Sequence, residues 1–72
     1  MALLSDGSHD VVVVDAREDD EGVLHLELAV TSGAHKGDVV RVAARATARG
    51  ALDVLGLPAT LHVHDGVPRV DF

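Results

Sequence analysis

Cysteine, tyrosine and tryptophan are absent from this chain of 72 residues, and phenylalanine occurs only at Phe72. Without cysteine no disulfide can stabilise the fold, and no thiolate is available to bind a metal or attack a substrate. Almost no aromatic surface is available to stack against nucleic-acid bases. No apolar run approaches the roughly 20 residues of a membrane-spanning helix. These absences argue against disulfide-stabilised, thiol-dependent and helical membrane proteins.

The first residues, Met1–His9, lack the basic start and apolar stretch of a signal peptide, so we expect a cytoplasmic protein. The chain length fits one domain, which we place at residues 9–72 after a loose lead-in over residues 1–8. A chain this short buries only about 60% of its unfolded surface. Because the core is small and sheet edges need protection, we expect a homodimer.

Positive charge is scarce. Six Lys and Arg residues stand against twelve Asp and Glu residues, which gives a net charge of −6 with histidine neutral. The imbalance is confined to residues 1–35, where one base faces eight acids, whereas residues 36–72 hold five bases and four acids. The net charge repels nucleic acid as a whole, but the second half of the chain can still form a local basic patch.

Hydrophobic periodicity predicts six elements in the order β-β-β-α-β-β. In chain order they are strands over Asp10–Ala16, Val23–Thr31 and Asp38–Ala46, a helical turn over Ala51–Leu55, and strands over Ala59–Asp65 and Val67–Phe72. The Asp65-Gly66 pair between the last two strands is typical of a type I′ hairpin turn. This is the chain order of the OB-fold, a five-stranded partly open barrel that binds oligonucleotides and oligosaccharides. We therefore predict an all-β, OB-like five-stranded barrel with one short helix.

Strand alternation and helical spacing also predict which side chains form the core. The predicted core residues are Leu24, Leu26, Leu28, Val40, Val42, Leu52, Leu55, Leu61, Val63 and Val70. The opposite face of the third strand carries arginines, and strands two and three form the ligand platform of an OB-fold. Guanidinium groups there can bind phosphates and stack on bases. The predicted nucleic-acid-binding residues are Lys36, Arg41, Arg45, Arg49 and His25, although Glu27 adds a negative charge to this face.

The loop Gly33-Ala34-His35-Lys36-Gly37 and its flanking strands carry a resemblance to known proteins. Together with the closing segment Leu55–Val70, they resemble small phage and mobile-element proteins encoded beside recombination or primase genes. That resemblance implies an OB-like accessory protein that binds single-stranded DNA. The Gly-x-x-Lys-Gly pattern is also similar to the KOW motif of SH3-like barrels, from which it departs because Arg41 occupies the position of a further glycine.

A second hypothesis is a protein–protein adaptor, in which an acidic edge docks onto a basic partner or mimics nucleic acid. The residues that would form this edge are Asp15, Glu18, Asp19, Asp20 and Glu21. An ordinary solvated loop is also consistent with these residues.

Other chemistry has little support in the sequence. The pairs His25 with Glu27 and His62 with His64 could contribute zinc ligands, but the second and fourth strands of an OB-fold are not neighbours, so we expect solvent-facing histidines and no metal. The serines lie in loops without a nucleophile motif, and so small a domain has little room for a water-excluding pocket. We expect no enzymatic activity and no cofactor.

Overall fold

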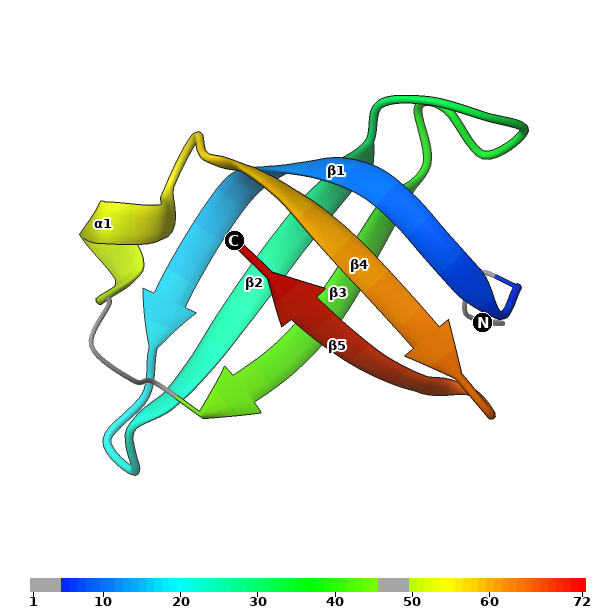
Figure 1. Cartoon of the computed structure of the whole chain (residues 1–72). Helices are drawn as coiled ribbons and strands as arrows, with labels where there is room; N and C mark the ends of the chain where they lie inside the picture. Colours follow the sequence, from blue (N-terminus) through cyan, green and yellow to red (C-terminus); the bar gives the residue numbers. More distant parts are fainter. Residues whose placement is uncertain (1–4, 46–49) are drawn as a thin grey trace.

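The structure is a computed structural model that describes residues 5–45 and 50–72 (Figure 1). Its elements are β1 (Gly7–Glu18), β2 (Val23–Val30), β3 (Val39–Arg45), α1 (Ala51–Val54), β4 (Pro58–His64) and β5 (Val67–Asp71). The predicted order of elements is confirmed. The largest difference is at β1, which starts at Gly7, before the expected domain boundary. Ala46, the predicted end of the third strand, lies outside the described residues.

All five strands belong to one antiparallel sheet in the order β3-β2-β1-β4-β5. The sheet curls so that β4 and β5 pass in front of β2 and β3 in Figure 1. The two edge strands, β3 and β5, approach each other, but no strand pairing joins them within the described residues. The fold is therefore mostly β, with five strands and one short helix, and the sheet is not closed into a barrel.

β1 contains a bulge at Val14. Val13 and Asp15 each have a partner on β2, whereas Val14 between them has none. A bulge bends its strand and increases the local twist. Next to it, the N–H of Val13 donates to the carbonyl of Leu57 at 3.0 Å, and the N–H of Gly56 donates to the carbonyl of Val13 at 2.8 Å. These bonds attach the segment after α1 to the bend.

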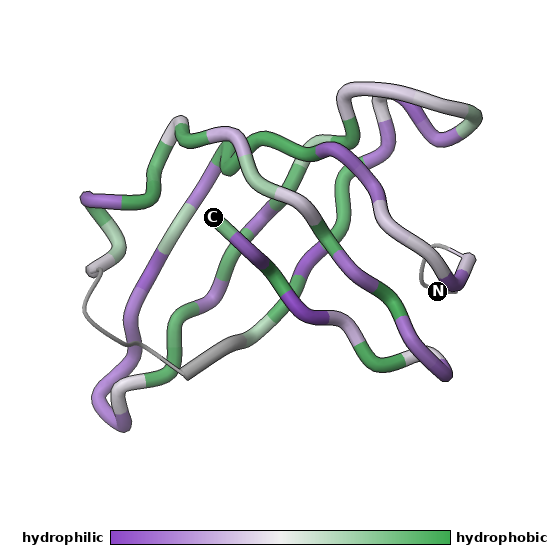
Figure 2. Tube along the Cα trace, in the orientation of Figure 1, coloured by the Kyte–Doolittle hydropathy of each residue, from purple (hydrophilic) through white to green (hydrophobic). Residues whose placement is uncertain are grey.

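The core is a single cluster of leucine and valine side chains from β1, β2, β3, β4 and α1, with Val70 of β5 packed against it. Apolar and polar residues alternate along the strands (Figure 2), so that one face of the curled sheet is buried. The buried residues are Val11, Val13, Leu24, Leu26, Leu28, Val30, Val40, Val42, Val54, Leu61 and Val63. The strand part of the predicted core is confirmed.

The helix forms where it is predicted, but the prediction that Leu52 and Leu55 join the core is wrong. Leu52 is 88% exposed and Leu55 is 47% exposed, whereas Val54 is fully buried and joins the core. The helix contains only four residues, so it has no stripe of apolar residues to fix which side faces the sheet. The helix packs against β1, and this packing places Val54 in the core instead. In the described parts of the chain, no helix is long and apolar enough to cross a membrane.

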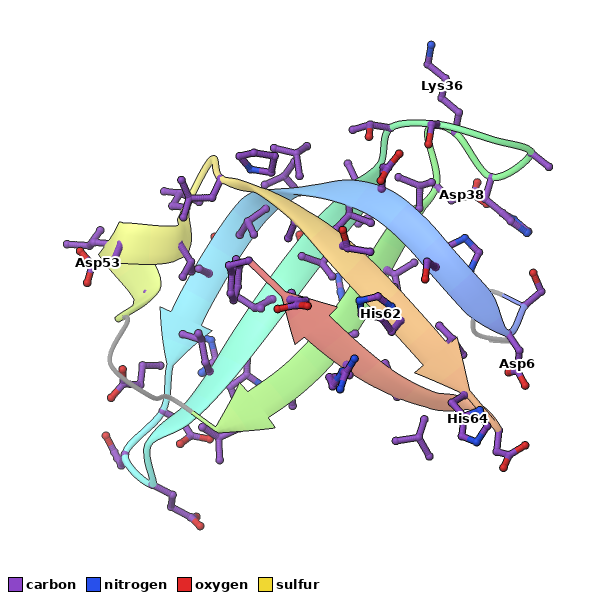
Figure 3. All side chains as sticks on the ribbon, viewed as in Figure 1. Asp6, Lys36, Asp38, Asp53, His62 and His64 are labelled. Atoms are coloured by element: carbon purple, nitrogen blue, oxygen red, sulfur yellow. The ribbon has the colours of Figure 1, made fainter. Side chains whose placement is uncertain are left out.

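The β4–β5 hairpin turns at Asp65-Gly66, with positive φ angles of 52° and 77°, as a type I′ turn requires at both central positions. Asp6 caps this turn from the other end of the chain (Figure 3). Its Oδ2 accepts a hydrogen bond from the N–H of Asp65 at 3.1 Å, and its Oδ1 accepts one from the N–H of Gly66 at 3.3 Å. Part of the expected loose lead-in is thus attached to the sheet.

Candidate functional site

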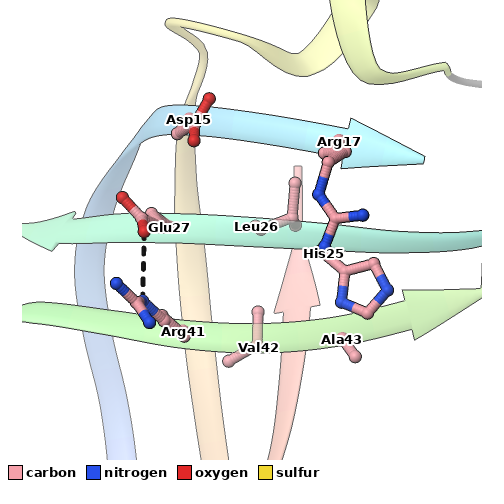
Figure 4. Close-up of a pocket in the computed structure, with 8 residues that line it drawn as sticks. All are labelled: Asp15, Arg17, His25, Leu26, Glu27, Arg41, Val42 and Ala43. Atoms are coloured by element: carbon pink, nitrogen blue, oxygen red, sulfur yellow. Dashed lines mark ion pairs between the residues drawn. The ribbon is translucent and has the colours of Figure 1, made fainter. Parts of the chain in front are cut away.

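Two rows of side chains, all polar except that of Ala43, cross the outer face of β1, β2 and β3 (Figure 4). The rows are Asp15–Glu27–Arg41 and Arg17–His25–Ala43. Residues directly opposite each other on antiparallel strands point to the same side of the sheet, with Cβ atoms about 5 Å apart. The strand alternation that buries Leu24, Leu26 and Leu28 therefore gathers these polar groups on one surface, as the sequence predicts for Arg41 and His25.

Arg41 is paired with a carboxylate on the neighbouring strand. Its Nε lies 3.0 Å from Oε1 of Glu27, and its side chain is 81% exposed, whereas Glu27 is half-buried. In water such an ion pair contributes at most about 1 kcal/mol to stability. Its main effect is to neutralise and orient the guanidinium, so an anionic ligand would compete with Glu27 for Arg41.

Asp19 organises the turn between β1 and β2. Its Oδ1 accepts hydrogen bonds from the N–H groups of Glu21 and Val23, at 2.9 and 3.0 Å. Its Oδ2 accepts a hydrogen bond from Nε2 of His25 at 2.9 Å. The bond from His25 and the two backbone bonds lower the pKa of Asp19 from 3.8 to about 2. Asp19 thus connects the turn to a histidine of the outer face.

The two rows border a shallow groove of about 490 Å³. Its lining residues are Asp15, Arg17, His25, Leu26, Glu27, Arg41, Val42 and Ala43. The lining holds two arginines and two carboxylates, which gives no net charge with the histidine neutral. This surface is much less acidic than the chain as a whole, which carries −6. Two of the five predicted nucleic-acid-binding residues, His25 and Arg41, line this groove.

Not all of the predicted basic residues reach the groove. Lys36 lies at the tip of the β2–β3 loop and points away from the sheet (Figure 3). The loop turns at Gly33 and Gly37, which have φ angles of 80° and 94°, as its glycine pattern predicts. Arg45 ends β3, opposite Val23 of β2. Arg49 lies outside the described residues.

The predicted acidic edge is divided between two places. Asp15 is exposed and lines the groove. Glu18, Asp20 and Glu21 are exposed at the end of β1 and in the β1–β2 turn. Asp19 differs from them because its carboxylate is used within the turn. The sequence places Asp19 in the acidic edge but gives no indication of its contact with His25, because the contact depends on how the turn folds back on β2.

A second polar cluster lies on β1, β4 and β5 around His62, and the sequence does not indicate its contacts with Ser8 and Asp71. Oγ of Ser8 lies 2.9 Å from Nδ1 of His62, and Nε2 of His62 lies 3.7 Å from Oδ2 of Asp71. His64 is almost fully exposed and lies 3.5 Å from the carboxylate of Asp65. No group of three histidine or carboxylate side chains within residues 5–45 and 50–72 is placed to hold a metal ion.

Comparison with protein-family models, with curated proteins and with solved structures gives no match.

Proposed function

We propose that this chain is a non-enzymatic binding module with an OB-like fold, and that it holds a single strand of nucleic acid across the outer face of β1, β2 and β3. The observation that carries the proposal is the groove lined by Arg17, His25 and Arg41. OB-folds bind extended ligands on the face formed by their second and third strands and on the adjoining loops.

The strand order supports the OB-like part of the proposal. The sheet order β3-β2-β1-β4-β5 places β3 and β5 at the two edges, as in a five-stranded barrel that stays partly open between them. The helix between β3 and β4 packs Val54 into the core, and the bulge in β1 supplies the bend that a small barrel needs. An accessory role in replication or recombination follows from the sequence resemblance alone.

The chemistry of the groove suits phosphate more than bases. The ion pair with Glu27 involves Nε of Arg41, and a guanidinium has four further N–H donors on its terminal nitrogens. Those donors can bind a phosphate in the two-pronged geometry that arginine favours. Without tyrosine or tryptophan to stack on bases, binding should be weak and insensitive to sequence.

Replacing Arg41 tests the proposal directly. Binding of a single-stranded oligonucleotide should weaken with salt, with a log–log slope of about −0.7 for each phosphate contacted. Because few basic side chains are available to contact phosphates, we expect an overall slope of roughly −1.5 to −3 for the unmodified chain. Arg41→Ala should weaken binding and make the slope shallower by about 0.7. Fluorescence anisotropy of a labelled oligonucleotide across a salt series measures both the affinity and the slope.

A third substitution in the groove and two matched controls make this test specific. Glu27→Gln releases Arg41 from its partner, so it should tighten binding, whereas Glu21→Gln makes the same charge change at the turn and should have a smaller effect. Arg69→Ala removes an exposed arginine of β5 outside the groove and is the control for Arg41→Ala. Equal losses from the two arginine variants, or no binding at low salt, would rule out the platform.

The acidic adaptor remains a second candidate because of one observation. The hydrogen bonds of Asp19 fix the β1–β2 turn, so Asp20 and Glu21 are presented on an ordered turn rather than a loose loop. A fixed pair of carboxylates suits docking onto a basic protein surface. Under this hypothesis the chain binds no oligonucleotide, and an oligo-arginine peptide binds it in a way that Asp20→Asn with Glu21→Gln weakens.

A further inference from the structure

The two edges of the sheet differ in how well they are protected against pairing. β5 has five residues and carries Pro68, and proline has no N–H to donate to a neighbouring strand. β3 has seven residues without proline, Val39–Arg45, and pairs only with β2 in the described part of the chain. Its outer face includes Val39, which is half-exposed, and the small side chain of Ala43. An edge strand of this length without proline is a template for pairing with another chain, provided that the register keeps its arginines apart.

We propose that β3 pairs with β3 of a second copy of this chain, antiparallel, about a two-fold axis through Val42. The ten strands of the two copies would then form one continuous sheet. In this register Arg41 lies opposite Ala43 of the partner subunit, and Val42 lies opposite Val42 of the partner subunit. All seven residues of β3 find partners, and each outer face continues into the outer face of the other copy.

Charge repulsion disfavours the registers in which the two-fold axis passes through a residue next to Val42. An axis through Arg41 would place that arginine opposite its own copy, and like charges directly opposite each other destabilise a strand pair. An axis through Ala43 would pair position 41 with position 45, which is also an arginine. Axes further along the strand leave only three residues of β3 paired with one another. The axis through Val42 alone combines full overlap with a small residue opposite Arg41.

The size of the domain gives this pairing a physical purpose. A chain of 72 residues has a small core, and the unpaired N–H and C=O groups of β3 would gain hydrogen bonds in the dimer. Pairing would also bring the grooves of the two copies onto one surface. The dimer does not depend on the proposed ligand, because every contact that defines it lies within β3.

Charge substitutions at Ala43 test the dimer and its register together. The unmodified chain should sediment as a dimer of the 7.5 kDa subunit at tens of micromolar. Ala43→Arg would place an arginine opposite Arg41 of the partner subunit at two symmetric positions, so the dissociation constant should rise roughly tenfold. Ala43→Glu would create an attractive pair there and should lower the constant.

These effects oppose those expected from net charge. Ala43→Arg changes the net charge from −6 to −5, and Ala43→Glu changes it to −7, so general repulsion alone would strengthen the first dimer and weaken the second. Leu52→Arg makes the same charge change on exposed α1 and should not weaken the dimer. Combining Arg41→Glu with Ala43→Arg restores attraction across the axis. Glu27→Gln in the same variant removes the carboxylate that would otherwise repel the new one between β2 and β3, so the dimer should be restored.

Sedimentation equilibrium measures all five proteins, and circular dichroism checks that each is folded. A monomer across the concentration range would overturn the proposal. A dimer that Ala43→Arg leaves unchanged, or that Leu52→Arg weakens equally, would show that the copies meet elsewhere. A combined variant that is folded but fails to recover the dimer would exclude the register through Val42.

Discussion

Asp19 is the side chain with the most connections in the candidate site. Its carboxylate holds two backbone N–H groups of its own turn and the ring of His25. All three bonds favour the charged form of Asp19, which is why its pKa falls to about 2. The folded chain therefore binds the proton at Asp19 less readily than the unfolded chain does, and the stability of the fold depends on pH.

Acid should remove the contribution of Asp19 over a defined range. Because its pKa is lower in the folded chain than the ordinary 3.8, the stabilisation is fully present above about pH 4 and is lost as the pH falls towards about 2. Asp19→Asn should melt at a lower temperature than the unmodified chain at neutral pH, and should lose less further stability between pH 4 and pH 2. Thermal unfolding followed by circular dichroism measures both.

The neighbouring acid provides the control for this experiment. Asp20 is exposed in the same turn, so Asp20→Asn makes the same chemical change without removing the bonds to the backbone and His25. It should retain the acid-dependent loss of the unmodified chain. If the two variants respond to acid in the same way, the bonds of Asp19 do not stabilise the fold.

Among the elements, the β4–β5 hairpin shows how a local signal is completed by a distant residue. Asp65-Gly66 is sufficient to predict the turn, because both central residues must adopt positive φ. The cap by Asp6 is separated from it by almost the whole chain and has no sequence signature. It depends on β1 pairing with β4, which brings the segment before Gly7 beside the turn.

Removing the cap should weaken the hairpin without unfolding the domain. Asp6→Ala leaves the N–H groups of Asp65 and Gly66 to water and should cost about 0.5–1.5 kcal/mol, because both bonds are exposed. Amide hydrogen exchange in β5 should become faster than in the unmodified chain. Asp6→Asn keeps one acceptor oxygen, so its rate of amide exchange in β5 should lie between the rates of the unmodified chain and of Asp6→Ala. Unchanged exchange in β5 after Asp6→Ala would mean that the turn forms without the cap.

The elements also show which parts of the fold the sequence could predict. Alternation over β2 and β3 specifies both faces, because a strand has only two, and it correctly assigns Leu26 and Val42 to the core and Arg41 to the outside. The single turn of α1 lacks this constraint. Leu52 and Leu55 satisfy helical spacing, yet the chain path around the bulge of β1 turns Val54 inward.

In the candidate site, too, the sequence predicts what strand alternation determines and does not predict what loop folding determines. The side on which Arg41 and His25 lie, and the presence of Glu27 beside them, follow from strand alternation. The bond between Asp19 and His25, and the position of Lys36 away from the groove, depend on how loops fold in three dimensions. A carboxylate two to four residues before a glycine-containing turn is typical of side-chain-to-backbone capping. That signal indicates a local role for Asp19 but gives no information about its histidine partner.

The molecule as a whole combines an acidic body with one nearly neutral face. The net charge of −6 opposes binding of any polyanion at long range, whereas the groove itself carries no net charge. A ligand held there would depend on short-range bonds to Arg41 and Arg17, and so few phosphate contacts would give only a shallow dependence of affinity on salt. The same acidity opposes the association of two copies in general, and β3 is a place where it is locally reversed, because β3 carries Arg41 and Arg45 and no acidic residue.

The stability of the whole molecule depends on a single core. Leu26 is 2% exposed and Leu52 is 88% exposed, so the same Leu→Ala change compares a core position with a surface one. Leu26→Ala should lower the free energy of unfolding by about 2–5 kcal/mol, and Leu52→Ala should change it by no more than about 0.5 kcal/mol.

Urea unfolding followed by circular dichroism is the appropriate measurement, because the chain has no tryptophan or tyrosine to report by fluorescence. Protein concentration must be the same for both variants, since dimer formation adds to apparent stability. A large loss from Leu52→Ala would mean that α1 packs its leucines inward, and a Leu26→Ala variant as stable as the unmodified chain would rule out the assigned core.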